Sequence, residues 1–447
     1  MKLGCSTLGL GLFLLAELMT SGQQILWQFT NDVPQSYFSG SPAVGDDGTI
    51  YIGTANESSS GNKLYAITPD GTQRWQFVSG SRITTTPVVG ANGTIYCGSA
   101  TGTVFAITSD GSLAWQYNTG ARDVRHVALS DDGTIYVAAP YYPVGSPFTK
   151  SKLYALSEDG VKRWEFSDSA TTPDRQPVIN FDGTVYFSTT TKFYALNPDG
   201  TVYWSLPIQS GTAAIGADGT IYVGGTDDIP NSIGLLRALN QDGTADWSFP
   251  AGSTKELIGA DGTIYFSQYA LSPQGEVKQE SRTSFDSGVV AADGTLYARN
   301  SGNLAAIGSN GGIKWQVSFP SGLTGSPALM PDGTLYISDP TRLYAVKVLC
   351  GLANSPWPMD GHDLKRTGQA RLGSQVRPCL SPIRLASGRG FQFTMIGEIG
   401  VSYRIEASAD LATWAMWTNF VCTNSVTHFT DAGATNQDRR FYRAVSP

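Results

Sequence analysis

The sequence predicts an all-β chain: an eight-bladed β-propeller that is closed by its N-terminal strand and followed by a small β-sandwich domain. Two observations lead to this fold class. A segment recurs eight times at intervals that scatter around the roughly 40 to 45 residues of one propeller blade. Each copy alternates apolar and polar residues, as half-buried strands do. The 51 glycines among 447 residues agree with a chain that has many tight turns.

Residues 47–75 contain one complete copy of the repeat. They read Asp-Gly-Thr-Ile-Tyr, a polar loop, Leu-Tyr-Ala-Ile, Pro-Asp-Gly and finally Thr-Gln-Arg-Trp. Apolar residues at alternate positions, such as Ile50 with Ile52 and Leu64 with Ala66, indicate strands, and each Asp-Gly supplies the left-handed backbone geometry of a hairpin turn. One copy is therefore expected to form one four-stranded antiparallel sheet.

The first Gly-Thr step of each repeat gives the number of copies. Its glycines are Gly48, Gly93, Gly133, Gly183, Gly219, Gly262, Gly294 and Gly333. Six copies have a tryptophan near their end, namely Trp75, Trp115, Trp164, Trp204, Trp247 and Trp315. The sixth copy has Gln279 at that place, and the eighth ends before it. Trp27 precedes all copies. Because an open ring would leave an unpaired edge strand, the strand around Trp27 is expected to complete the last blade.

The pattern Tyr-Ala-x-x-x-Asp-Gly-x-x-x-Trp resembles the tryptophan-docking repeat of the quinoprotein alcohol dehydrogenase-like propellers. The small members of that family include the outer-membrane assembly lipoprotein of bacteria. The resemblance covers about residues 25 to 348. It implies the propeller fold and a structural role for the tryptophans, but it does not fix the function, since one fold hosts many sites.

Residues 1–22 are expected to be a signal peptide that is removed on export. They contain Lys2, an apolar run over 8–19 that only Glu17 interrupts, and then three small residues. A buried first helix is the alternative. Cys5 precedes the apolar run, so it does not indicate a lipoprotein. No later stretch is long and apolar enough to span a bilayer. The protein is therefore expected in the periplasm, at the cell surface or outside the cell.

The charge of the chain limits its partners. With 30 Lys and Arg against 37 Asp and Glu, the formal net charge is −7. Nucleic-acid binding depends on neutralising phosphates with Lys and Arg, so it is disfavoured, as is attraction to membrane surfaces. An envelope protein or a polysaccharide is the expected partner.

The cysteines and histidines give no metal signature. Cys97 lies in an expected strand and is interpreted as a small buried apolar residue. Cys350 and Cys379 flank a Pro/Gly-rich linker at 349–380 and could form a disulfide across it in an oxidising compartment. No close pair of cysteines indicates zinc.

Within the linker, Trp357 precedes a run that contains Asp360, His362 and Asp363. These side chains could hold a metal. We favour a turn cap that packs Trp357 against a neighbouring domain, and no metal site is predicted.

One face of the propeller carries the variable loops. In a meander the first and third connections, here the Asp-Gly turns, lie on one side. The long segments 54–62, 138–150 and 225–234 lie on the other side, where sites are usually built. They could also be tolerated insertions.

Residues that open the inner strands on this loop side would surround the mouth of the central channel. The charged and amide ones are Arg125, His126, Arg175, Gln176, Lys255 and Asp286. We hypothesise a cationic pocket for an anionic or polyhydroxyl ligand, with Tyr141, Tyr142 and Phe148 as an aromatic wall. A solvated polar channel is the alternative.

The sequence gives little support for catalysis. The three histidines are His126, His362 and His428, and no Gly-x-Ser-x-Gly motif is present. The Asp-Gly turns lack the further oxygen ligands of a calcium loop. Quinone-dependent dehydrogenases that resemble this fold have adjacent cysteines, which this chain lacks. The expected function is a non-catalytic binding or scaffolding module at the bacterial cell envelope, with no cofactor. A PQQ-dependent oxidoreductase with calcium and a reduced site is the alternative.

The tail at 381–447 is expected to be a second domain after the propeller at 23–348. Short alternating runs at 391–393, 403–407, 414–417, 427–429 and 441–444 predict a small β-sandwich. The motif Tyr-Arg-Ile-Glu-Ala-Ser with a later Arg-Phe-Tyr-Arg resembles a C-terminal module of exported proteins from environmental bacteria, which implies attachment or carbohydrate contact. Trp414 and Trp417 are interpreted as core residues, with an exposed binding platform as the alternative.

Overall fold

The computed structural model consists of strands, turns and irregular segments. It describes residues 24–32, 35–56, 61–142, 150–169, 171–173, 175–227, 234–250, 255–281, 284–300, 302–370, 379–383, 391–396, 402–409, 413–421, 426–431 and 441–445. The predicted signal peptide lies outside these residues. Within the described ranges, no helix has the length and apolar character needed to cross a membrane.

The described chain contains eight four-stranded antiparallel sheets. The first two are β2 (Tyr37–Val44), β3 (Ile50–Ala55), β4 (Lys63–Ile67) and β5 (Gln73–Val78), then β6 (Val88–Val89), β7 (Ile95–Gly98), β8 (Thr103–Ile107) and β9 (Leu113–Asn118). The third and fourth are β10 (His126–Leu129), β11 (Ile135–Tyr141), β12 (Lys150–Leu156) and β13 (Lys162–Ser169), then β14 (Val178–Ile179), β15 (Val185–Ser188), β16 (Phe193–Leu196) and β17 (Val202–Leu206).

The second half of the ring repeats this plan. The fifth and sixth sheets are β18 (Ile208–Ile215), β19 (Ile221–Asp227), β20 (Leu235–Leu239) and β21 (Ala245–Pro250), then β22 (Leu257–Ile258), β23 (Ile264–Phe266), β24 (Tyr269–Leu271) and β25 (Val277–Glu280). The seventh is β26 (Ser287–Val290), β27 (Leu296–Asn300), β28 (Asn303–Ile307) and β29 (Ile313–Ser318). The eighth combines β30 (Ala328–Leu329), β31 (Thr334–Ser338) and β32 (Arg342–Lys347) with β1 (Gln24–Thr30).

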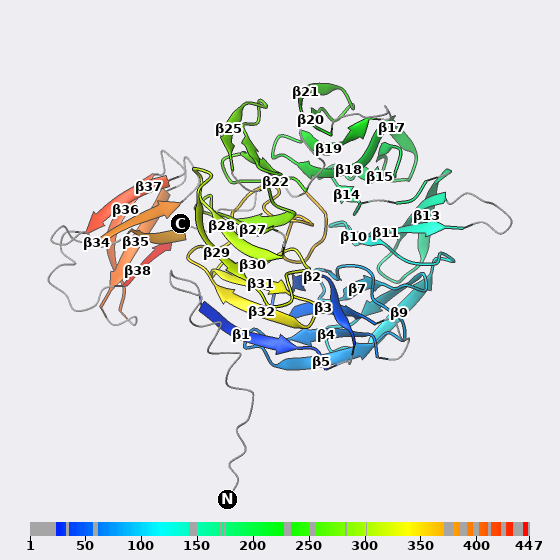
Figure 1. Ribbon diagram of the computed structural model, residues 1–447, viewed down its shortest axis with the longest axis horizontal. Coiled ribbons are helices and arrows are strands. Elements are labelled where there is room, and N and C mark those ends of the chain that lie inside the picture. Colours follow the sequence, from blue (N-terminus) through cyan, green and yellow to red (C-terminus); the bar gives the residue numbers. More distant parts are fainter. Residues whose placement is uncertain are drawn as a thin grey trace, which may run out of the picture.

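The start of the described chain closes the ring. Figure 1 shows the four-stranded sheets around a common centre in chain order, with β1 next to β32. In this antiparallel pair Trp27 lies opposite Ala345 and Gln28 opposite Tyr344. Beyond β1, Asp32 accepts hydrogen bonds from Lys63 Nζ (2.9 Å) and from the Tyr65 hydroxyl of the first sheet. The expected closure by the N-terminal strand is confirmed.

Tryptophans connect neighbouring sheets. The indole Nε1 of Trp27 donates to Pro69 O at 2.7 Å, in the third turn of the next sheet, and Trp75 donates to Ser109 O at 2.9 Å. The same bond joins Trp115 to Glu158 O, Trp164 to Pro198 O, Trp204 to Gln241 O and Trp247 to Pro273 O. Trp27 thus makes the same contact at the closure as the other five make between neighbouring sheets.

The sixth repeat departs from this arrangement. Trp315 of the seventh sheet packs on Tyr297 of its own sheet, with ring centroids 5.8 Å apart, as Trp75 packs on Tyr51 at 5.7 Å. In the sixth sheet Gln279 occupies the position of the tryptophan. It lies against Gly311, so that a Cβ atom added to Gly311 would be 3.1 Å from Cγ of Gln279. The turns themselves are as expected: Gly48 has φ 78°, and Asp47 Oδ1 accepts the Thr49 N–H at 3.0 Å.

Cys97 of β7 is a buried thiol, as the sequence predicts. Its burial raises the pKa of the thiol to about 12. At pH 8 only about one such thiol in ten thousand is ionised, so we expect almost no alkylation of Cys97 in the native protein and ordinary alkylation in denaturant. Peptide mass spectrometry after a short iodoacetamide pulse measures this. Cys97→Ala serves as the control for peptide assignment, and rapid native labelling of Cys97 would contradict the expectation.

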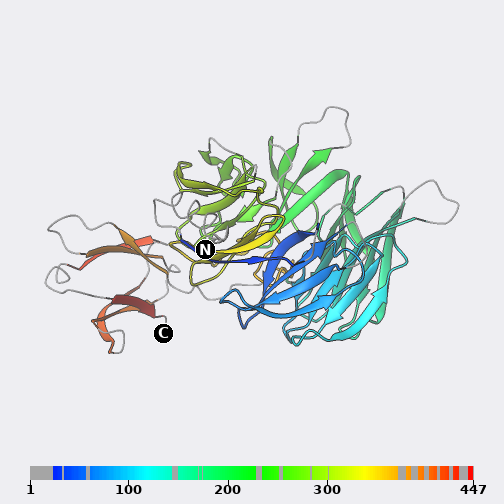
Figure 2. The same ribbon diagram turned by 60° about the horizontal axis from the view of Figure 1, so that its bottom comes forward.

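Two three-stranded sheets follow the ring and lie to one side of it (Figures 1 and 2). They comprise β33 (Cys379–Ile383), β34 (Phe391–Ile396) and β37 (Val426–Asp431), and β35 (Ser402–Ser408), β36 (Ala415–Val421) and β38 (Phe441–Val445). Trp417 is half-buried against Phe429 and Tyr442, and the Arg443 guanidinium lies 4.3 Å from the Trp414 ring. Cys350 is disulfide-bonded. The side chain of Cys379, its predicted partner, lies outside the described part.

Candidate functional site at the centre of the ring

Residues 349–370, here called the axial segment, run inside the ring (gold trace in Figure 1). The backbone N–H groups of six inner strands donate to carbonyl oxygens of this segment. The bonds are Val44 to Leu364, Val89 to Lys365, Leu129 to Thr367, Ile179 to Gly368, Ile258 to Trp357 and Val290 to Pro358, at 2.7 to 3.0 Å. Each donor is the last residue of its strand, next to the first turn. The axial segment therefore closes the channel at its turn end.

This position differs from the sequence interpretation of 349–380 as a linker. The innermost strand of each sheet has an unpaired edge, and its buried N–H groups need acceptors. An irregular backbone rich in Pro and Gly can present carbonyl groups to strands that point in several directions. The axial segment satisfies those donors, so it belongs to the interior of the ring over residues 349–370.

Arg366 is the largest buried polar side chain of the axial segment, with 1% of its surface exposed. Its Nε donates to Pro42 O at 3.2 Å, and its Nη2 donates to the carbonyl oxygens of Ser326 and Pro327, each at 3.0 Å. Its Nη1 donates to Asp360 O. Burial lowers the pKa of the guanidinium to about 10, so it remains charged at neutral pH. Arg366 thereby joins the first sheet, the eighth sheet and the axial segment.

Asp360, whose backbone carbonyl accepts from Arg366, also holds its carboxylate in hydrogen bonds. Its Oδ2 accepts hydrogen bonds from Lys255 Nζ at 2.5 Å and from Ser326 Oγ at 2.8 Å. Burial alone would raise the pKa of this carboxyl, but the positive charges of Lys255 and Arg366 lower it to about 2. Asp360 is therefore ionised at every physiological pH.

A cavity of about 330 Å³ lies between the axial segment and the residues that open the inner strands. Of the predicted channel-mouth residues, His126, Arg175, Gln176 and Lys255 line it. Four hydroxyl side chains also line it, namely Ser41, Thr86, Thr324 and Ser326. His126, Gln176 and Lys255 lie seven residues before the first Gly-Thr glycine of their repeats, and Arg175 lies eight before it, so this spacing identifies side chains that converge in space.

The other predicted residues lie outside the lining of this cavity. Arg125 Nη1 donates to Pro173 O at 3.2 Å, and Asp286 Oδ2 lies 3.9 Å from Arg299, which does line the cavity. Tyr141 lies under Lys152, whose Nζ is 4.5 Å from the ring centroid. Tyr142 lies under Arg122, at 5.5 Å. Phe148 is outside the described residues.

The predicted loop 138–150 is shorter in the structure. Strand β11 continues to Tyr141, which pairs with Lys150 at the start of β12. The ladder extends because the run before Tyr141 keeps both of its faces buried, including Ala138 and Ala139. This register holds the Tyr141 backbone in the sheet, so its side chain packs on Lys152 of the neighbouring strand.

Sequence reasoning missed the residues that the axial segment adds to the cavity. They are Trp357, Asp360, Gly361 and Gly368, and the cavity also includes Glu256 and Arg299. One signal was present: charged residues such as Asp360 and Arg366 lie in a Pro/Gly-rich run without any repeat pattern. Glu256 follows Lys255 directly and is buried, with 3% of its surface exposed.

The histidine of the axial segment packs against a tryptophan. The His362 ring lies 5.1 Å from the Trp357 ring, and Asp363 accepts two hydrogen bonds from Thr367, each at 3.0 Å. Trp357 is buried in the core of the fourth to sixth sheets. Over the described residues, no group of three His, Cys, Asp or Glu side chains converges. The geometry agrees with the turn-cap interpretation.

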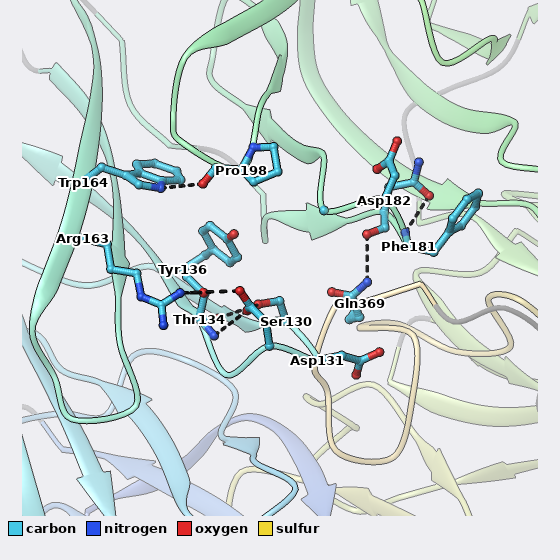
Figure 3. A pocket seen from close by; sticks show the side chains of 13 residues that line it. Ser130, Asp131, Thr134, Tyr136, Arg163, Trp164, Phe181, Asp182, Pro198 and Gln369 are labelled. Carbon is cyan, nitrogen blue, oxygen red and sulfur yellow. Dashed lines mark hydrogen bonds and ion pairs between the residues drawn. The ribbon is translucent and has the colours of Figure 1, made fainter.

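A second pocket, of about 430 Å³, lies on the turn side between the third and fourth sheets. Figure 3 shows Trp164 and Pro198 on one side of it and Phe181 and Asp182 on the other. The axial segment reaches it through Gln369, whose Nε2 donates to Asn180 O at 2.9 Å. The Trp164 indole is already bonded to Pro198 O, so this pocket includes a sheet-to-sheet contact of the ring.

The Asp360 carboxyl should make stability depend on pH. Its pKa is lowered from 3.8 to about 2 on folding, so the stabilisation is fully present above about pH 4 and is lost as the pH falls through about 2. The shift corresponds to roughly 2 kcal/mol. The free energy of unfolding, measured with denaturant between about pH 6 and pH 2, should fall less steeply with decreasing pH in Asp360→Asn than in the wild type. Equal slopes would contradict this assignment.

Comparisons with known proteins agree with the ring. Residues 17–167 and 149–278 match the family described as outer membrane protein assembly factor BamB, together more than half of the chain. BamB from Moraxella catarrhalis is similar in structure, with a TM-score of 0.55 and 17% identity over 73% of this chain and 98% of that chain. None of the curated proteins compared with this chain matches it.

Two further solved structures share the fold. The C-terminal WD40 domain of Sif2 has a TM-score of 0.55 and 12% identity over 74% of this chain and 99% of that chain. The quinohemoprotein alcohol dehydrogenase ADHIIG from Pseudomonas putida HK5 has a TM-score of 0.50 and 11% identity over 87% of this chain and 80% of that chain. Identities this low establish the fold alone. From the family match and the repeat, the chain belongs to the PQQ-repeat β-propeller family that includes the assembly factor BamB.

Proposed function

We propose that this protein is a non-catalytic, exported β-propeller that binds a protein or polysaccharide of the bacterial cell envelope and acts there as a scaffold. In this proposal the eight four-stranded sheets are the blades of one closed ring, and the two C-terminal sheets form a β-sandwich for attachment or carbohydrate contact. The match to the family of an outer membrane assembly factor supports an envelope role. The predicted signal peptide supports export to the periplasm, the cell surface or the outside.

The observation that carries the proposal is the convergence of side chains from several sheets on the central cavity. Its walls come from all eight sheets and their links, and the axial segment closes it at the turn end. Rigid backbone positions these side chains, which favours a preformed binding site. We assign ligand contact to His126, Arg175, Gln176 and Lys255. Arg125, Asp286, Tyr141 and Tyr142 form a surrounding surface for a larger partner.

The residues do not fit the quinone and calcium of the dehydrogenase alternative. Calcium takes about six to eight oxygen ligands, whereas the described chain brings no three acidic, His or Cys side chains together. Asp360, the carboxylate that the axial segment adds to the cavity, is already bonded to Lys255 and Ser326. We therefore derive no oxidation step for this protein.

Two measurements on the mature full-length chain test the proposal. The first is retention on immobilised envelope polysaccharides and on purified outer-membrane proteins, where we expect binding to at least one class. The second is incubation with pyrroloquinoline quinone and Ca²⁺, followed by dye-linked oxidation of alcohols and sugars, where we expect no turnover. Turnover with bound quinone, or the absence of binding to both classes, would overturn the proposal.

A further inference from the structure

We infer that the central cavity binds a small hydroxylated acid, namely one sugar acid residue such as a hexuronate. This inference rests on the proposed binding function and names the ligand class of the cavity. Three properties of the lining carry it: an excess of positive charge, hydroxyl groups with protons left to donate, and a volume that suits one sugar ring.

The first property is charge. The cavity wall and the residue behind it hold four cationic side chains, Arg175, Lys255, Arg299 and Arg366, and two carboxylates, Glu256 and Asp360. The hydrogen bonds described for Arg366 all go to backbone carbonyl oxygens, so no carboxylate is bonded to its guanidinium. Without Arg366, which Asp363 offsets, the lining has three of these cations against the two carboxylates, an excess of one positive charge, and the exposed Asp286 lies 3.9 Å from Arg299 at its edge. Because this site is partly buried, salt screens that excess less than at an open surface. The cavity therefore favours an anion.

The second property is the direction of the hydroxyl groups. Ser41 Oγ accepts the Ser326 N–H at 2.9 Å, and Thr86 Oγ1 accepts the Ser41 N–H at 3.2 Å. Each of these oxygens accepts from the backbone, so its own proton is available to donate to a ligand oxygen. Ser326 Oγ donates to Asp360 instead and can accept from a ligand hydroxyl. This mixture of donors and acceptors matches a sugar ring better than it matches a bare phosphate or acetate.

The third property is size and access. A volume of about 330 Å³ corresponds to roughly eleven molecules of liquid water, which accommodates one sugar ring and not a polysaccharide. Gly40, Gly361 and Gly368 contribute backbone to the cavity wall, and a Cβ atom at each would face neighbouring protein atoms at 2.9 to 3.1 Å. Trp357 adds an apolar surface. The occupant is therefore either a free monosaccharide acid or the terminal residue of an acidic polymer.

Isothermal titration of the mature full-length chain tests the inference with four probes: glucuronate, galacturonate, the neutral sugar glucose, and acetate. We expect at least one uronate to bind about tenfold more tightly than glucose and acetate, because a charged hydrogen bond and the ring hydroxyls contribute together. Short uronate oligomers distinguish the two sources. Tighter binding of oligomers than of monomers indicates a polymer end, and equal binding indicates a free sugar acid.

Two variants locate the site. Arg175→Gln removes a cavity cation and should weaken uronate binding about tenfold, whereas Lys192→Gln removes an exposed loop-side cation of the same sheet and should leave it unchanged. The thermal unfolding midpoint of each variant checks that it remains folded. Equal affinity for glucose and uronates, or unchanged uronate binding in folded Arg175→Gln, overturns the inference. If no uronate binds but envelope polymers or proteins still do, the inference is overturned and the proposed function stands.

Discussion

Arg366→Ala should lower the free energy of unfolding by about 3 to 5 kcal/mol, because it removes a buried charge and leaves its partners without a donor. The carbonyl oxygens of Pro42, Ser326 and Pro327 would each lose the bond from Arg366 in a site that water does not reach. Asp360 would lose one of the two positive charges that keep it ionised. Denaturant-induced unfolding followed by tryptophan fluorescence measures the loss.

Lys365→Ala is the matched control for Arg366, since the two residues are adjacent in the axial segment. Lys365 Nζ pairs with Asp46 Oδ2 at 2.6 Å, but that carboxylate is 77% exposed. Exposed pairs contribute about 0 to 1 kcal/mol, so a small loss is expected. Arg366→Lys keeps the charge but not the forked donors and should fall between the two. If both alanine variants lose the same small amount, Arg366 does not hold the sheets together as described.

Gly71→Ala should destabilise the closure of the ring by about 2 to 5 kcal/mol in total. Gly71 has φ 89°, a conformation that costs an alanine about 1 to 2 kcal/mol. A Cβ atom there would also lie 2.6 Å from Cδ2 of Trp27, and such overpacking costs typically about 1 to 3 kcal/mol more. The indole would be displaced from its bond to Pro69 O. Unfolding in denaturant and limited proteolysis of β1 measure both effects.

Gly80→Ala separates the two contributions. Gly80 has φ 69°, and nothing lies within 4 Å of a Cβ atom added there. It should show the backbone cost alone, so it should be less destabilised than Gly71→Ala and should keep β1 resistant to protease. Equal losses in the two variants would show that Trp27 is not held in place by its contact with the third turn of the first sheet.

Most of the ring could be predicted because its information is local and repeated. Each Asp-Gly marks one turn in the sequence, and each tryptophan marks one outer strand. Trp27 shows in the same way that one strand precedes the first repeat. Counting back from the Gly-Thr glycine of each repeat places His126, Gln176 and Lys255 at equivalent positions and Arg175 one residue earlier, and the structure brings these four into one cavity. Repetition therefore predicts which backbone positions face the axis.

The axial segment could not be predicted in the same way. Its contacts with the ring use mainly its backbone carbonyl groups, which every residue has, so Leu364 or Gly368 has no recognisable signature. The positions of Tyr141 and Tyr142 depend on the ladder between β11 and β12, and alternation alone does not say where a strand ends. The sequence could not place side chains whose positions depend on backbone contacts or on the length of a loop.

The axial segment also sets an order for assembly during synthesis. The sheets are made from the first to the eighth, yet the acceptors for six inner strands are all supplied after residue 349. A nascent chain that has just been extended past β32 contains the residues of every four-stranded sheet, but not yet the acceptors for these inner strands. Completion of the ring interior therefore waits for a stretch of about twenty residues that is synthesised after the eight sheets and before the C-terminal ones.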